Sequence, residues 1–148
     1  MQRYLYEGTD YKFELGKGIT LAEGSDVTIV ATGLMVHIAL EAKELLAKEG
    51  ISAEVINIHT IKPIDTELLA KSASKTGAVV TAEEHNIVGG LGGAVCEALA
   101  ETCPVPVLRV GVEDVYGRSG KVPALLEAYG LTAENIAAKA KAAIALKK

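Results

Sequence analysis

Short apolar segments alternate with longer amphipathic ones along most of this chain. Apolar runs rich in β-branched residues begin near positions 27, 53, 78 and 107, which are 26, 25 and 29 residues apart. Between them, apolar residues recur at helical spacing, for example in 34–48. This alternation is typical of successive βαβ units, and strands that are apolar on both faces indicate a sheet covered on both sides. We therefore predict a three-layer, doubly wound α/β fold with a mainly parallel sheet of about five strands.

The boundaries of the elements follow from local signals. Gly50 ends the first helix, Asp65 opens the second, and Thr132 is a plausible N-cap of the last. The expected strands are 27–31, 53–58, 78–82 and 107–112, and the expected helices are 34–48, 66–74, 91–101, 122–129 and 133–146.

The first 25 residues differ from the rest of the chain. They contain Tyr4, Tyr6, Tyr11 and Phe13, and they lack helical periodicity. Residues 11–15 alternate apolar and polar positions and are followed by a glycine turn and an extended piece at 19–21, which predicts a short hairpin. We interpret 1–25 as an arm or linker and 26–148 as the folded domain.

Composition narrows the class of protein. The chain has 148 residues, 49% hydrophobic and 23% charged, which fits one globular domain. Its net charge of −4 argues against a nucleic-acid partner, which requires a basic surface. No apolar run approaches the length of a membrane span, and the N-terminus has no signal-peptide core, so we expect a cytoplasmic protein.

Titratable residues follow several of the predicted strands. His59, Glu84, His85 and Glu113 are all placed where strands end, and the carboxyl ends of parallel strands share one edge of the sheet. Such a rim suits acid–base chemistry or metal binding. However, the spacing contains no metal-ligand motif and no nucleophile elbow. A polar rim that faces water or a partner protein is the simpler interpretation.

Two glycine-rich loops are further candidates. Gly89 and Gly90 lie in a glycine run before a predicted helix, where free backbone amides can receive a phosphate. The P-loop and dinucleotide fingerprints are both absent, and the glycines serve close packing equally well. Arg118, in the second loop, is a possible anion contact.

At these same segments the chain resembles a known family. The motifs, in order, are FELGKG (13–18), DVTIVATG (26–33), NIHTIKPID (57–65), TAEEHNIVGGLG (81–92), GVED (111–114), GRSG (117–120) and YGLT (129–132). Together they resemble the C-terminal domain of transketolase, most closely the C-terminal section of split transketolases. Leu34-Met35 after Gly33, and Glu84 where single-chain transketolases often have Asp, favour the split type.

The resemblance implies a fold and a role. The whole enzyme would use thiamine diphosphate and Mg²⁺ to move a two-carbon ketol unit between sugar phosphates of the pentose phosphate pathway. The family's Gly-Asp-Gly motif is absent here, so the resemblance implies no catalytic, cofactor-binding or metal residue in this chain. It implies a domain that is inactive alone and that packs on the pyrimidine-binding and diphosphate-binding domains of a homodimer. Residues 1–25 would be the linker from a preceding pyrimidine-binding domain.

Two other readings stay open. Related domains occur in deoxyxylulose-phosphate synthases and in the beta subunits of 2-oxo acid dehydrogenases. A different class is a free-standing module that binds anions or proteins through the glycine run and the rim.

Overall fold

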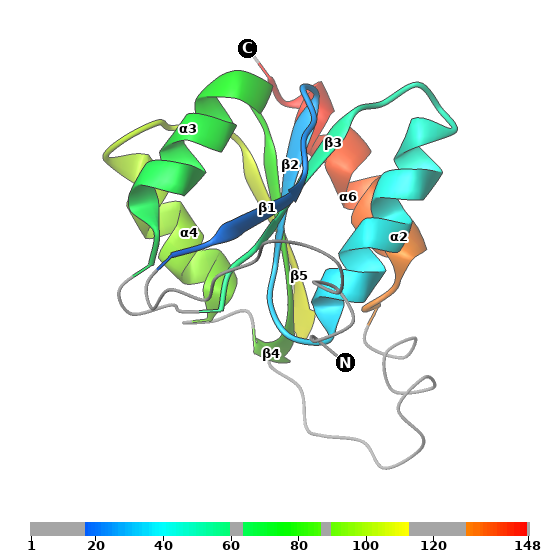
Figure 1. Cartoon of the computed structure of the whole chain (residues 1–148), viewed down its shortest axis with the longest axis horizontal. Helices are drawn as coiled ribbons and strands as arrows, with labels where there is room; N and C mark the ends of the chain where they lie inside the picture. Colours follow the sequence, from blue (N-terminus) through cyan, green and yellow to red (C-terminus); the bar gives the residue numbers. More distant parts are fainter. Residues whose placement is uncertain (1–16, 60–63, 87–89, 113–129, 148) are drawn as a thin grey trace.

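A five-stranded sheet lies between two layers of helices in the computed structural model, which describes residues 17–59, 64–86, 90–112 and 130–147 (Figure 1). The strands are β1 (Ile19–Ala22), β2 (Val27–Ala31), β3 (Ala53–Asn57), β4 (Val79–Asn86) and β5 (Val107–Val112). Their order across the sheet is β1-β3-β2-β4-β5. Strands β2 to β5 are parallel, and β1 runs antiparallel to β3 at the edge.

The helices divide between the two faces of the sheet. Helices α2 (Met35–Ala47) and α6 (Ala133–Ala145) cover one face, and α3 (Thr66–Thr76) and α4 (Leu91–Ala100) cover the other (Figure 1). Each face has its own core. Ile29, Val80 and Ile136 belong to the first, and Val30, Val79 and Val95 to the second. Neighbouring residues of one strand supply different cores because side chains alternate along a strand. The predicted fold class is confirmed.

Local signals set the helix boundaries much as the sequence predicts. The Asp65 side chain accepts a hydrogen bond from the Leu68 amide at 3.2 Å and caps α3. At the other end of α3, Gly77 has a left-handed conformation with φ +77°, which glycine adopts without strain. Thr132 caps α6 by accepting from the Asn135 amide at 3.1 Å. The predicted helix 122–129 and the extended piece 11–15 lie outside the described residues.

The end of the predicted arm belongs to the sheet. Strand β1 pairs with β3, and the turn after it approaches β3 so closely that a Cβ on Gly24 would lie 2.3 Å from the carbonyl carbon of Ala53. The Gly18 amide donates to Asp65 at 2.9 Å, which joins the start of β1 to the cap of α3. Residues 18–24 are therefore built into the domain described here.

The order of the strands reverses between β2 and β4: the connection after β2 leads to β3 on one side, and the connection after β4 leads to β5 on the other. These two strands are neighbours, but β2 leads into α2 on one face and β4 leads into α4 on the other. In open α/β sheets, ligands bind at such a switch point, in the crevice outside the carboxyl ends of the strands. The carboxyl ends of β2 and β4 are therefore the first place to look for a site.

Candidate functional site

Three of the predicted rim residues have described positions at the carboxyl edge of the sheet. His59 follows β3 and is half-buried, Glu84 lies near the end of β4 and is exposed, and Gly90 precedes α4. Because β2 lies between β3 and β4, His59 and Glu84 stand on opposite sides of β2. The edge is shared, as predicted, but these two residues do not come from adjacent strands.

The other predicted site residues are less fully described. His85 is part of β4, and its side chain is not among those described. Gly89, Glu113 and Arg118 lie outside the described residues. The acid–base, metal and anion roles predicted for the rim therefore stay predictions.

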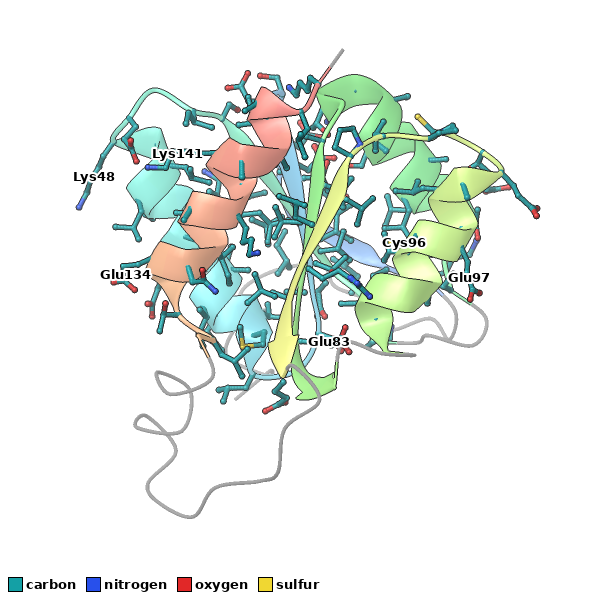
Figure 2. The ribbon with its side chains drawn as sticks, turned by 180° about the vertical axis from the view of Figure 1, so that it is seen from behind. Lys48, Glu83, Cys96, Glu97, Glu134 and Lys141 are labelled. Carbon is teal, nitrogen blue, oxygen red and sulfur yellow. The ribbon has the colours of Figure 1, made fainter. Side chains whose placement is uncertain are left out.

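Glu83, one residue before Glu84, makes the most complete set of contacts at this edge. Its side chain is only 1% exposed. One carboxylate oxygen accepts from the Leu91 amide and the other from the Gly92 amide, both at 2.8 Å. These are amides of the first turn of α4, which has no hydrogen bond from the side chain of its own N-cap residue (Figure 2 labels Glu83 beside the start of this helix). Glu83 is thus the cap of α4, supplied by the preceding strand.

Glu84 makes a weaker contact of the same kind on the opposite face. Its Oε1 accepts from the Leu34 amide at 3.4 Å, and a Cβ on Gly33 would lie 2.7 Å from the same oxygen. Leu34 is the N-cap residue of α2, which has no side-chain cap of its own and no acidic residue in its first turn. Glu84 therefore joins β4 to the start of α2 across the switch point.

A second polar cluster lies inside the domain, between the sheet and α3. Glu54 of β3 is 3% exposed and accepts hydrogen bonds from Ser72, from the Lys75 ammonium and from the Gly24 amide. The Ser72 hydroxyl is also 2.7 Å from the hydroxyl of Thr28. These contacts give the buried carboxylate three donors, two from α3 and one from the turn between β1 and β2.

The cluster continues into the core through hydroxyl groups. Thr28 Oγ1 lies 2.7 Å from Thr76 Oγ1, and Thr76 is also 3.1 Å from the Ala78 carbonyl oxygen. An ionised carboxylate only accepts, so Ser72 donates to Glu54 and accepts from Thr28. Thr76 has one hydroxyl proton, and Thr28 Oγ1 and the carbonyl oxygens of Ser72 and Ala78 are the acceptors within its reach. This hydroxyl chain ties α3 to β2 and β3.

The charges in this cluster stabilise each other. Burial of Glu54 opposes ionisation, but hydrogen bonds from Lys75, Ser72 and the Gly24 amide outweigh it, so the pKa of Glu54 lies below its ordinary value of 4.5. The hydrogen bond to Glu54 raises the pKa of Lys75, whose side chain is 46% exposed. We interpret Glu54 as a structural carboxylate because all of its described contacts are internal to the domain.

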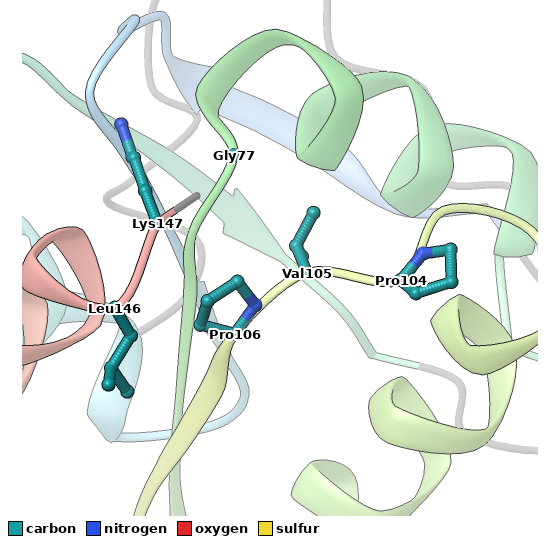
Figure 3. Close-up of a pocket in the computed structure, with 6 residues that line it drawn as sticks. All are labelled: Gly77, Pro104, Val105, Pro106, Leu146 and Lys147. Atoms are coloured by element: carbon teal, nitrogen blue, oxygen red, sulfur yellow. The ribbon is translucent and has the colours of Figure 1, made fainter.

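Two of the hollows lined by described residues lie away from the switch point. One, of about 480 Å³, lies where β4 and β5 begin, and its lining is Gly77, Pro104, Val105, Pro106, Leu146 and Lys147 (Figure 3). This is the amino edge of the parallel strands, opposite to the edge where ligands bind in such sheets. The other, of about 300 Å³, lies over the Glu54 cluster between β1 and α3.

The roles of Glu83 and Glu54 were not predicted from the sequence. Glu54 is a charged residue inside the otherwise apolar run 53–56, and a buried charge requires hydrogen-bonding partners, whereas Glu83 begins the polar segment 83–86 and offers no such contrast. A charged residue among apolar strand residues was the signal that the sequence offered for Glu54. It indicates that a partner exists, although it does not identify the partner.

Comparison with known proteins gives a consistent result. The family model described as transketolase, C-terminal domain, matches residues 16–136. A subunit of 6-deoxy-6-sulfo-D-fructose transketolase from Clostridium sp. (strain MSTE9) is 57% identical over 125 residues, which is 84% of this chain and 39% of that subunit. A 1-deoxy-D-xylulose-5-phosphate synthase from Heliobacterium modesticaldum is 50% identical over 128 residues, 86% of this chain and 20% of the synthase.

A solved structure has the same fold. It is described as a split gene transketolase, an inactive beta4 tetramer, and it superimposes with a TM-score of 0.91 at 55% sequence identity. The match covers 94% of this chain and 46% of that one. The chain thus spans less than half the length of each of these relatives.

Proposed function

Because this chain belongs to the transketolase C-terminal domain family, we propose that it is the C-terminal domain of a split transketolase, which transfers two-carbon ketol units between sugar phosphates. The observation that carries this proposal is the likeness to a split transketolase over 94% of this chain but only 46% of that one. More than half of such a subunit would then lie in other domains.

The role proposed for this domain is structural. It packs on the pyrimidine-binding domain and helps a cytoplasmic homodimer to assemble, and the catalytic groups belong to the pyrimidine-binding and diphosphate-binding domains. Residues 1–25 are proposed to lead in from the pyrimidine-binding domain, and 18–24 at the end of this segment already belong to the domain described here. The likeness to a chain described as an inactive beta4 tetramer supports the view that this domain has no activity alone.

The described residues do not suit thiamine diphosphate or Mg²⁺. A diphosphate needs several free donors, but two first-turn amides of α4, the helix that follows the glycine run, already donate to Glu83. Within 17–59, 64–86, 90–112 and 130–147, no three residues among His, Cys, Asp and Glu are grouped closely enough to hold a metal ion. No step of the reaction is therefore assigned to these residues.

Calorimetry can test the assignment of the cofactor to other domains. Thiamine diphosphate with Mg²⁺ is titrated into this chain and, as the positive control, into the enzyme assembled with the domains that complete it. We expect saturable heat from the assembled enzyme and none from this chain. Saturable binding to this chain alone would contradict the proposal.

The reaction needs a separate test because the 50% identical relative is a synthase. The assembled enzyme is assayed with xylulose 5-phosphate and, in parallel, with pyruvate as the donor substrate. We expect turnover of the ketose phosphate. Turnover of pyruvate alone would instead favour a 1-deoxy-D-xylulose-5-phosphate synthase.

A further inference from the structure

The switch point of this sheet contains two carboxylates from consecutive residues. Glu83 and Thr81 point toward the face that α4 covers, since a Cβ on Gly92 of α4 would lie 3.0 Å from the Thr81 hydroxyl. Glu84 points to the opposite face and reaches the start of α2. Side chains alternate along a strand, so two consecutive residues of β4 supply one carboxylate to the start of each helix.

Both helices would otherwise begin with unsatisfied donors. The first amides of a helix have no partner within it, and the helix dipole adds a partial positive charge at this end. For this reason helix N-termini at switch points bind phosphates and other anions. Neither α2 nor α4 has an acidic residue in its first turn that could balance this charge.

The contacts of Glu83 are those that an anionic ligand would make. Its two oxygens receive two successive amides, Leu91 and Gly92, at 2.8 Å each, and the side chain is almost completely buried. This two-point contact uses both oxygens of the carboxylate. An external anion at these amides would have to displace a group that is covalently attached and already in place.

Strand β5 also packs closely against the start of α4. A Cβ at Gly92 would lie 2.5 Å from Cδ and 2.7 Å from Cγ of Arg109, so the Arg109 side chain lies directly against the helix backbone. The glycine allows this close packing, which holds the first turn of α4 next to β5, the neighbour in the sheet of the strand that supplies Glu83.

We propose that Glu83 is a built-in anionic ligand that fills the N-terminus of α4 and excludes phosphate-bearing ligands from the switch point of this domain. Glu84 has the same role, with a longer contact, at α2. In other doubly wound sheets the crevice at the switch point is a ligand site. Here the helix amides beside it already donate to carboxylates of the protein itself. This inference concerns the chain itself and does not depend on which reaction the whole enzyme catalyses.

Removal of the internal ligand should create a site for a soluble one. Glu83→Ala deletes a fragment equivalent to acetate, and Glu97→Ala is the matched control because Glu97 is an exposed glutamate of α4, the helix that Glu83 caps. Amide chemical shifts and thermal midpoints are measured for wild type and both variants with sodium acetate, with inorganic phosphate, and with sodium chloride at equal ionic strength.

We expect acetate and phosphate to shift the Leu91 and Gly92 amides in Glu83→Ala only, with saturation, and acetate to raise the midpoint of that variant selectively. Wild type and Glu97→Ala should respond to acetate as they do to chloride. Saturable phosphate shifts at Leu91 and Gly92 in wild type would overturn the proposal. An equal effect of acetate on all three proteins would also overturn it.

Glu83→Gln keeps the proposal testable if Glu83→Ala fails to fold. A glutamine has one accepting oxygen in place of two, so one of the two amides must lose its partner. We expect hydrogen exchange of either Leu91 or Gly92 to accelerate roughly 10- to 100-fold, with no change at Val95 in the same helix. Unchanged exchange at both amides would show that Glu83 does not act as their ligand.

Discussion

Thr28 and Thr81 provide a matched test of the hydroxyl chain. Both are buried, at 1% and 0% exposure, and they lie on the adjacent strands β2 and β4. Thr28 Oγ1 lies 2.7 Å from the hydroxyls of both Ser72 and Thr76. Thr81 Oγ1 is buried and has no hydrogen-bond partner in the structure over the residues that it describes. The substitution Thr→Val keeps the side-chain shape and removes only the hydroxyl, so it isolates this difference.

The expected effects have opposite signs. A neutral hydrogen bond contributes about 0.5–1.5 kcal/mol, so Thr28→Val loses about 1–3 kcal/mol from two of them. The added methyl group returns about 0.8 kcal/mol on burial, which leaves a net loss of about 0.2–2.2 kcal/mol. Thr81→Val loses no described hydrogen bond and removes a hydroxyl that is costly to bury, so it should be neutral or stabilising by up to about 1 kcal/mol.

Urea unfolding followed by far-ultraviolet circular dichroism measures both free energies, and it suits a chain without tryptophan. At roughly 2–4 °C per kcal/mol for a domain of this size, Thr28→Val should also lower the thermal midpoint, by up to about 9 °C. Equal destabilisation by the two substitutions would refute the reasoning, because the hydrogen bonds of Thr28 would then contribute nothing beyond side-chain shape.

Three further predictions concern single positions. The pKa of Glu54 is lowered in the folded state, so its contribution to stability is present above its unfolded pKa, near 4.5, and is lost as the pH falls through the folded value. Below about pH 4.5, the free energy of unfolding of Glu54→Gln should therefore fall less steeply with pH than that of wild type. Parallel pH dependences of the two proteins would contradict this. Gly24→Ala should destabilise by about 1–3 kcal/mol, because its Cβ would meet the backbone of Ala53. Gly93→Ala should stabilise α4 by about 0.5–1 kcal/mol, since no described atom lies within 4 Å of its Cβ. Urea titrations measure the free energy of unfolding of both glycine variants. A lower stability for Gly93→Ala than for Gly24→Ala would count against both predictions.

The architecture could be predicted because its signals are local. The strand 27–31 and the helix 34–48 follow from apolar spacing within each segment, and the structure has β2 at Val27–Ala31 and α2 at Met35–Ala47. The caps Asp65 and Thr132 act on amides three residues away, so a short window of sequence contains both partners. An extended piece at 19–21 was also expected, as part of a hairpin with 11–15, but its pairing with β3 at the edge of the sheet was not.

The contacts at the site could not be predicted in the same way. Ser72 and Glu54 are 18 residues apart, and Thr28 and Ser72 are 44 apart, so these partners meet only after the sheet and α3 have packed. Glu83 and Leu91 are eight residues apart, and one belongs to β4 and the other to α4. The sequence indicated an edge rich in polar residues, but the pairing of each carboxylate with a helix depends on which face of β4 it occupies.

The Glu83-Glu84 dipeptide also limits how this gene can change. Two adjacent codons specify contacts with opposite layers of the protein, so a point mutation alters one layer at a time. Insertion or deletion of one codon earlier in β4 would move each carboxylate to the wrong side and would disrupt both helix starts in a single event. We therefore expect length variation among natural relatives to avoid this strand, while substitutions at either position remain tolerable one at a time.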